Sequence, residues 1–170
     1  TSKNIALGVN ILNQTACDGG FSYTNAYASV AYTGVKFGKE GNHRLVFAMQ
    51  GGVISRRVDQ SKFKWGEQWN PITGYNAANA TTESFAATSS TKLDLGAGVL
   101  YYDANPEKKA NVFGGLSVFH INKPKDPIIS SQSGNLNTIP MRYVLHGGLS
   151  CNVSERTRIV PHALFMKQST

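Results

Sequence analysis

The sequence predicts an all-β fold, an antiparallel up-and-down transmembrane β-barrel of which about seven long strands are present in this chain. Apolar and polar residues alternate with a period of two over long segments, whereas helical periodicity is nearly absent. These segments exceed the usual strand length of about 5–6 residues and reach the roughly 9–11 residues that a tilted strand needs to cross a bilayer. Short turns alternate with longer connections, which is typical of outer-membrane barrels.

The expected strands follow one another along the chain, each bounded by turn-forming residues such as Gly, Asn, Asp and Ser. They are Asn4–Asn13, Ser22–Phe37, His43–Arg56, Lys92–Asp103, Asn111–Asn122, Pro140–Val153 and Thr157–Lys167.

The connections between these strands fall into two classes. Three short polar turns are expected at Gly38–His43, Ala104–Ala110 and Ser154–Thr157, and longer connections at Gln14–Phe21, Arg57–Thr91 and Lys123–Ile139. Since all three short turns join strands in the same sense, they are expected at one end of the barrel and the long loops at the other.

Two connections carry candidate partner-binding residues. The long outer loop, residues 57–91, holds Trp65 and Trp69; exposed aromatic side chains can anchor a partner, although these two could equally fold the loop back over the barrel rim. Lys108 and Lys109 lie on a short turn, where they could dock a protein at the opposite end.

The strand Pro140–Val153 shows the alternation most clearly. Its candidate lipid-facing residues are Met141, Tyr143, Leu145, Leu149 and Val153, and polar residues occupy most of the positions between them. The same alternation would suit a soluble β-barrel that hides its apolar face inside and binds a small apolar ligand. Strand length and loop layout favour the membrane barrel. Glycines recur in mid-strand, and we interpret them as positions that relieve crowding inside the barrel and permit bending.

Composition excludes several classes of function. Charged residues make up 16% of the chain, below the roughly 25% of soluble domains, and the net charge is +7. The one basic concentration, at Arg56, Arg57, Lys62 and Lys64, is interpreted as a solvated loop, so no nucleic-acid partner is expected. Cys17 and Cys151 form no disulfide framework.

No catalytic constellation can be recognised. The four histidines lack metal-ligand spacing, and no phosphate-binding or nucleophile motif stands in a strand-to-helix context. We therefore predict no catalytic residue, no cofactor and no metal site, and a protein that is not an enzyme.

Three motifs carry a resemblance to a known family. They are "GAGVLYY" (Gly96–Tyr102), "G-x-S-x-x-H-I-N-x-P" (Gly115–Pro124) and "P-x-R-Y-x-x-H-x-G" (Pro140–Gly148), in this order. The chain resembles the PorP/SprF family of outer-membrane proteins, which belong to the type IX secretion and gliding machinery of Bacteroidetes. The family-motif residues are Gly115, Ser117, His120, Asn122, Pro124, Pro140, Arg142, His146 and Gly148.

The resemblance implies a non-enzymatic β-barrel in the outer membrane of a Gram-negative bacterium, supporting secretion or surface anchoring of cargo. Its implied partners are outer-membrane lipid and either periplasmic or lipoprotein motor components or the signal domain of secreted cargo. A passive porin is an alternative. Residues 1–170 are expected to form one barrel domain that is a fragment of a longer barrel, because seven strands is an odd number and family segments expected on both sides are missing.

Overall fold

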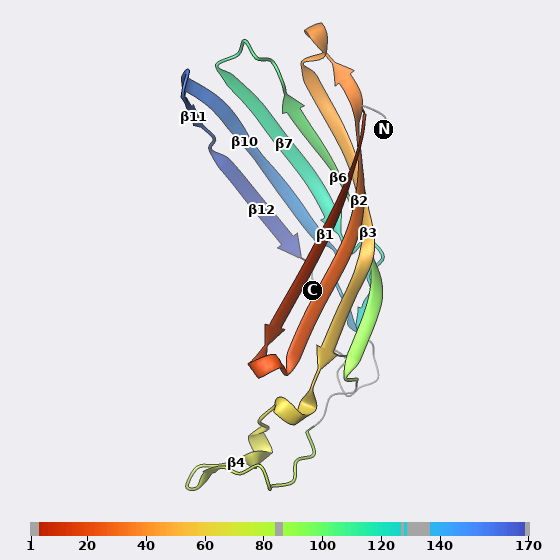
Figure 1. Cartoon of the computed structure of the whole chain (residues 1–170), viewed down its shortest axis with the longest axis vertical. Coiled ribbons are helices and arrows are strands. Elements are labelled where there is room, and N and C mark those ends of the chain that lie inside the picture. Colours follow the sequence, from red (N-terminus) through yellow and green to blue (C-terminus); the bar gives the residue numbers. More distant parts are fainter. Residues whose placement is uncertain (1–3, 84–86, 127, 129–136, 169–170) are drawn as a thin grey trace.

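The computed structural model describes residues 4–83, 87–126, 128 and 137–168. One antiparallel sheet of eight strands dominates it and is curled into a half-barrel (Figure 1). Strands of this sheet pair in chain order, which confirms the predicted all-β, up-and-down architecture. They are β1 (Ile5–Ala16), β2 (Phe21–Phe37), β3 (His43–Val58), β6 (Ser89–Asp103), β7 (Ala110–Phe119), β10 (Arg142–Ser154), β11 (Thr157–Ile159) and β12 (His162–Gln168), of which β11 and β12 both pair with β10.

The connections contain small elements of their own. Two short antiparallel pairs lie in the two longest connections: β4 (Trp69–Asn70) with β5 (Gly74–Tyr75), and β8 (Lys125–Asp126) with β9 (Asn137–Thr138). Short 3₁₀ turns are found at η1 (Cys17–Gly19), η2 (Lys39–Gly41), η3 (Gln60–Lys62) and η4 (Gly66–Gln68). Among the described residues, no helix has the length and apolar character needed to cross a membrane.

The first connection is shorter than the sequence predicts. β1 continues to Ala16 and β2 begins at Phe21, and these two residues pair directly. The expected long connection Gln14–Phe21 is therefore wrong, and residues 17–20 make a tight turn. Cys17 and Asp18 adopt positive φ angles of 54° and 51°, so the chain reverses direction within this turn. The polar residues at the ends of β1 and β2 can therefore pair with each other.

Three other boundaries differ from the sequence prediction. Arg57 pairs with Ser89, so the ladder of β3 and β6 shortens the long outer connection to residues 59–88. β7 ends at Phe119 and not at Asn122. The last predicted strand is divided into β11 and β12 at Pro161, because proline has no N–H group to donate to the ladder.

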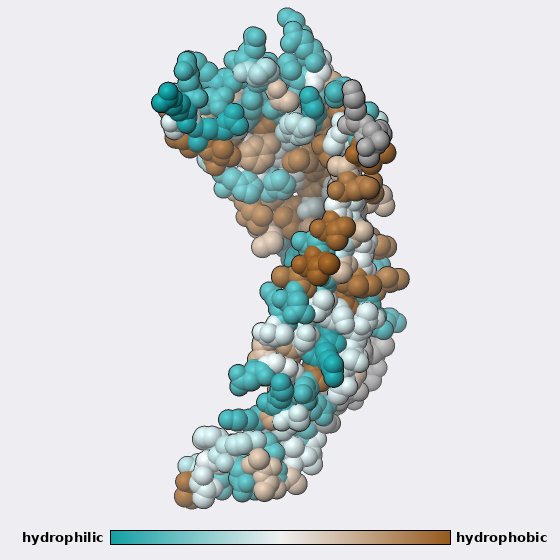
Figure 2. Space-filling model, viewed as in Figure 1, coloured by the Kyte–Doolittle hydropathy of each residue, from teal (hydrophilic) through white to brown (hydrophobic). Residues whose placement is uncertain are grey.

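The two faces of the sheet have opposite character. By the register, the concave face holds the even-numbered residues of β1, β3, β6 and β10 and the odd-numbered residues of β7 and of most of β2. Curvature crowds side chains on this face, and Ile54 and Val144 are 3% and 9% exposed. The alternate residues of each strand lie on the convex face, where the apolar side chains of Leu7 and Met49 are 79% and 67% exposed. Figure 2 shows hydrophobic residues gathered around the middle of the molecule and hydrophilic residues toward both ends. Such an outward apolar band is typical of membrane barrels.

Candidate functional site

A fully buried carboxylate joins three parts of the concave face. Asp94 on β6 is 0% exposed. Its Oδ2 accepts a hydrogen bond from the Tyr27 hydroxyl on β2 at 2.6 Å and lies 2.9 Å from Nδ1 of His120, just beyond β7. A buried carboxylate is costly unless it is hydrogen-bonded. The two contacts at Oδ2 offset part of that cost, while Oδ1 is buried and has no hydrogen-bond partner among the described residues. We call Asp94, Tyr27 and His120 the Asp94 cluster.

Gly52 makes the cluster sterically possible. Tyr27 pairs with Gly52, and Gly52 pairs with Asp94, so the three residues form one row across β2, β3 and β6. A Cβ at Gly52 would lie 2.7 Å from Cδ1 of Tyr27 and 2.0 Å from the carbonyl oxygen of Ala26. The tyrosine side chain thus crosses β3 in the space that a larger residue at position 52 would fill.

Replacement of Gly52 by alanine is expected to lower the free energy of unfolding by about 1–3 kcal/mol, the usual cost of overpacking. The neighbouring Gly51 is the matched control, because its Cβ would meet the end of the Leu95 side chain at 3.3 Å on the convex face and no backbone atom of the described residues within 4 Å. Urea titration of both variants in lipid vesicles checks this, and equal losses for Gly51→Ala and Gly52→Ala would contradict the account.

His120 reaches the cluster because the chain turns sharply after β7. Its φ is +58°, and Lys123, at +44°, donates its N–H to the His120 carbonyl at 3.0 Å. The side chain of Asn122 then makes hydrogen bonds to β6 like those of a neighbouring strand. Its amide nitrogen donates to the Leu93 carbonyl at 2.8 Å, and its amide oxygen accepts from the Leu95 N–H at 3.2 Å. The motif "H-I-N-x-P" therefore ends β7, satisfies the backbone of β6 and brings a histidine to Asp94.

The other motif histidine belongs to a different region. His146 on β10 lies against Gly115, where an added Cβ would be 2.6 Å from its Nε2. Its Nδ1 lies 3.4 Å from Nε2 of His162 on β12, and His162 in turn stacks on Phe113 at 5.8 Å between ring centroids. Within the described ranges, no group of three or more His, Cys, Asp or Glu side chains could hold a metal ion.

The remaining motif residues are mostly structural neighbours of these histidines. Ser117 lies on the concave face of β7, and Pro124 is buried, with its carbonyl accepting from the Ile139 N–H at 2.9 Å. Pro140 precedes β10 and accepts from the Gln168 amide at 3.3 Å. A Cβ at Gly148 would lie 2.8 Å from Cζ of Phe113, so this glycine leaves room for that ring.

A second ion pair links the connection after β7 to the eight-stranded sheet. Arg56 on β3 contacts Asp126 on β8 at 2.6 Å between Nη1 and Oδ2, and Asp126 is only 3% exposed. The guanidinium also lies 5.5 Å from the ring centroid of Tyr23. The interpretation of Arg56 as part of a solvated loop is therefore wrong, because β3 extends past it and places it on the concave face.

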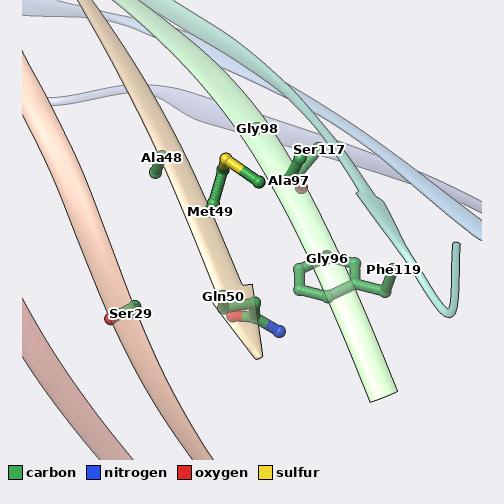
Figure 3. Close-up of a pocket in the computed structure, with 9 residues that line it drawn as sticks. All are labelled: Ser29, Ala48, Met49, Gln50, Gly96, Ala97, Gly98, Ser117 and Phe119. Atoms are coloured by element: carbon green, nitrogen blue, oxygen red, sulfur yellow. The ribbon is translucent and has the colours of Figure 1, made fainter. Parts of the chain in front are cut away.

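Arg142 occupies the same half of the concave face but has different surroundings. Its guanidinium lies 4.8 Å from the ring centroid of Phe119, its register partner on β7. A cavity of about 350 Å³ lies beside it, lined in part by Asn10, Asn25 and Gln50. Figure 3 shows Gln50 and Phe119 converging on Gly96 in an adjoining cavity of about 120 Å³.

The outer loop separates its two tryptophans. Trp65 is half-buried and packs on Phe63 with 5.9 Å between ring centroids, whereas Trp69 on β4 is 64% exposed. At the tip of the β4–β5 hairpin Ile72 is 93% exposed, and Asn70 Oδ1 accepts its N–H at 2.8 Å. Figure 1 shows this loop extending beyond the end of the sheet.

Hydrogen bonds within the loop give it local order. The Glu67 carboxylate accepts from the hydroxyl of Thr82 at 2.7 Å and from its backbone N–H at 2.6 Å. These two bonds lower the pKa of Glu67, since they stabilise the ionised form. These hydrogen bonds therefore stabilise the loop that carries the apolar tip.

Of the two lysines on the short turn between β6 and β7, one is paired with a carboxylate and the other is exposed. Lys108 contacts Asp103 at 2.5 Å between Nζ and Oδ2 and so belongs to the turn's own structure. Lys109 is exposed, and its backbone carbonyl accepts a hydrogen bond from the Asn152 N–H at 2.8 Å.

Four of the candidate lipid-facing residues lie on the convex face of β10. Tyr143, Leu145, Leu149 and Val153 are 39%, 56%, 45% and 62% exposed. Met141 stands just before β10, is half-buried, and accepts a hydrogen bond from the Tyr143 hydroxyl at Sδ, 3.9 Å away.

Sequence reasoning missed Tyr27, Gly52 and Asp126 as members of the polar interior. A signal was present for Tyr27 and Gly52, because each stands on the less apolar face of its strand. Their meeting depends on the register between strands, which a single sequence does not specify.

Comparison with known proteins agrees with this architecture. A search of curated proteins and a search of solved structures each gave no match. The family model described as type IX secretion system membrane protein PorP/SprF matches residues 1–170. That family is a membrane component of a secretion system and not a known family of enzymes. The chain therefore belongs to the PorP/SprF family of type IX secretion system membrane proteins.

Proposed function

We propose that this protein is a non-enzymatic β-barrel of the outer membrane of a Gram-negative bacterium, and that it supports secretion or surface anchoring of cargo by the type IX machinery. The observation that carries the proposal is the exposed apolar convex face of a curved antiparallel sheet whose concave face holds the Asp94 cluster. Contact of such an apolar convex face with lipid chains is favourable, whereas its contact with water is unfavourable.

Deletion of the gene tests the proposal as a whole. Cargo of the type IX machinery is expected to be lost from the cell surface or the medium, and the protein is expected in the outer-membrane fraction of the parent strain. A protein recovered in the soluble fraction without detergent would contradict the membrane assignment and favour a soluble barrel.

The strand ends support an orientation in the membrane. Membrane barrels have short periplasmic turns and longer external loops. The turns at residues 38–42, 104–109 and 155–156 are short, while the opposite end carries residues 59–88 and the connection after β7. In this orientation Tyr143, Leu145, Leu149 and Val153 meet lipid, and Met141 lies near the external boundary.

Periplasmic motor components then dock at the short turns. Lys109 is the cleaner probe of this docking because Lys108 is held by Asp103. Lys109→Glu is expected to reduce co-purification of a periplasmic partner several-fold, since reversing one exposed charge changes the complementarity of a docking surface. Lys62→Glu, on the outer loop, is the comparison at the opposite end; there the ammonium donates to the Asp18 carbonyl at 3.1 Å. Unchanged co-purification with Lys109→Glu, or an equal loss with Lys62→Glu, would contradict docking at the turns.

The outer loop meets cargo or another external protein through its apolar tip. Trp69→Ser is expected to weaken this contact at least fivefold, because exposed aromatic anchors often contribute more than 1 kcal/mol. Trp65→Ser is the comparison: it removes an aromatic side chain packed within the loop. Pull-down with surface-retained cargo measures the effect, and retention of binding by Trp69→Ser would contradict this role of the tip.

A further inference from the structure

We propose that the cavity beside Arg142 on the concave face is a binding site for the carboxylate of a short peptide segment. The proposal concerns the interior of the half-barrel and does not depend on which cargo or motor protein the chain serves.

The cavity has the size of a ligand site. Its volume is about 350 Å³, within the range of about 300–1,000 Å³ usual for small-ligand pockets. It is open to the concave side and adjoins the cavity of about 120 Å³ shown in Figure 3, with which it shares Gln50 and Phe119. The adjoining space is bordered in part by small residues, Ala48, Gly98 and Ser117.

Arg142 gives the cavity a cation that lacks a carboxylate partner. Among the residues that the structure describes, no Asp or Glu oxygen lies within 4.0 Å of its guanidinium nitrogens, and its buried Nε has no hydrogen-bond partner. Arg56, in the same half of the concave face, is by contrast paired with Asp126 at 2.6 Å. The Phe119 ring beneath the guanidinium holds it in place.

The carboxylate of Asp94 is not exposed at the surface of this cavity. Asp94 is 0% exposed and does not line the cavity, because Tyr27 and His120 lie against its carboxylate. The polar groups that line the cavity beside Arg142 are side-chain amides, tyrosine hydroxyls and the His120 ring. An anion that enters therefore meets a positive charge and hydrogen-bond donors, a setting in which a guanidinium binds a carboxylate well.

The amides make a peptide the matching carrier of that carboxylate. Asn10, Asn25 and Gln50 stand on three successive strands, and the buried Oδ1 of Asn25 has no hydrogen-bond partner among the residues that the structure describes. Side-chain amides offer both donors and acceptors, which complement the N–H and C=O groups of a backbone. Leu12 and Phe119 supply the apolar wall between them.

The test uses the protein in detergent micelles and two probes, N-acetyl-tetra-alanine with a free terminal carboxylate and the same peptide amidated. We expect the acid to bind at least tenfold more tightly than the amide by ligand-observed NMR, since a charge-assisted hydrogen bond contributes about 1.5–3 kcal/mol. Arg142→Gln is expected to abolish this difference, and Arg142→Lys to retain part of it.

Two comparisons keep the result specific. Lys92→Gln removes the same charge from the concave face of β6 but does not alter the cavity lining, so it should leave the preference for the acid intact. If Lys92→Gln and Arg142→Gln reduce binding equally, the overall positive electrostatic potential of the concave face attracts the anion, and the proposed site at Arg142 is refuted. If acetate binds as tightly as the peptide acid, the amides contribute nothing and peptide recognition is refuted.

Discussion

Replacement of Asp94 by alanine is expected to lower the free energy of unfolding by about 3–5 kcal/mol. The substitution removes the acceptor of the Tyr27 hydroxyl and the partner of His120, and a hydrogen bond to a charged group contributes about 1.5–3 kcal/mol. Both partners would be left partly buried with unsatisfied polar atoms. Urea titration of the protein in lipid vesicles, followed by far-UV circular dichroism, measures the loss.

Asp94→Asn separates the contribution of shape from that of chemistry. The amide oxygen can still accept from Tyr27, and its size matches that of the carboxyl group, so the expected loss is about half that of alanine. If Asp94→Ala has no larger effect than Asp103→Ala, whose carboxylate lies at a strand end beside Lys108, the Asp94 cluster does not stabilise the wall.

Replacement of Val30 by arginine is expected to destabilise the membrane-inserted protein by about 2–4 kcal/mol, the cost of a cation facing lipid near the bilayer midplane. Val30 lies near the middle of β2 and is 45% exposed on the convex face, next to Leu7 and Met49 in the register. Its neighbours share the apolar surface, so the charge could not reach water without leaving the hydrocarbon region.

Ser29→Arg is the matched control, since it introduces the same side chain one residue away on the concave face. The cavity there accommodates part of the new side chain and leads toward the interior, so a loss below about 1 kcal/mol is expected. Heat-modifiable migration in gel electrophoresis and urea titration compare the pair. Equal effects of the two substitutions would show that lipid does not cover the convex face.

The fold was predictable because its signals are local. Period-two alternation, turn residues and strand length identify the long strands without knowledge of their partners. The predicted strand boundaries are wrong where the pairing or hydrogen bonding of particular residues differs from what these local signals indicate. Gln14 and Thr15 are polar and look like part of a loop but pair with Tyr23 and Ser22. Asn122 looks like the end of a strand but satisfies the backbone of β6 through its side chain.

The polar interior was only half predictable because it depends on register. His120 could be noticed as a motif residue, but its partner Asp94 lies on another strand, and Tyr27 reaches Asp94 only because Gly52 intervenes. A shift of one residue between β2 and β3 would move Tyr27 to the other face. The recurrent glycines, first interpreted as relief from crowding, have at Gly52 this specific steric role.

The most direct test of the account is the pattern of lipid contact along β3 in the membrane. Single spin labels would be placed at residues 45–50 of the protein after Cys17 and Cys151 are replaced by serine, and accessibility to oxygen and to a polar nickel complex would be measured. We predict that Leu45, Phe47 and Met49 favour oxygen, which partitions into lipid, and that Val46, Ala48 and Gln50 do not. The reverse alternation, or none, would contradict a barrel wall whose convex face meets the bilayer.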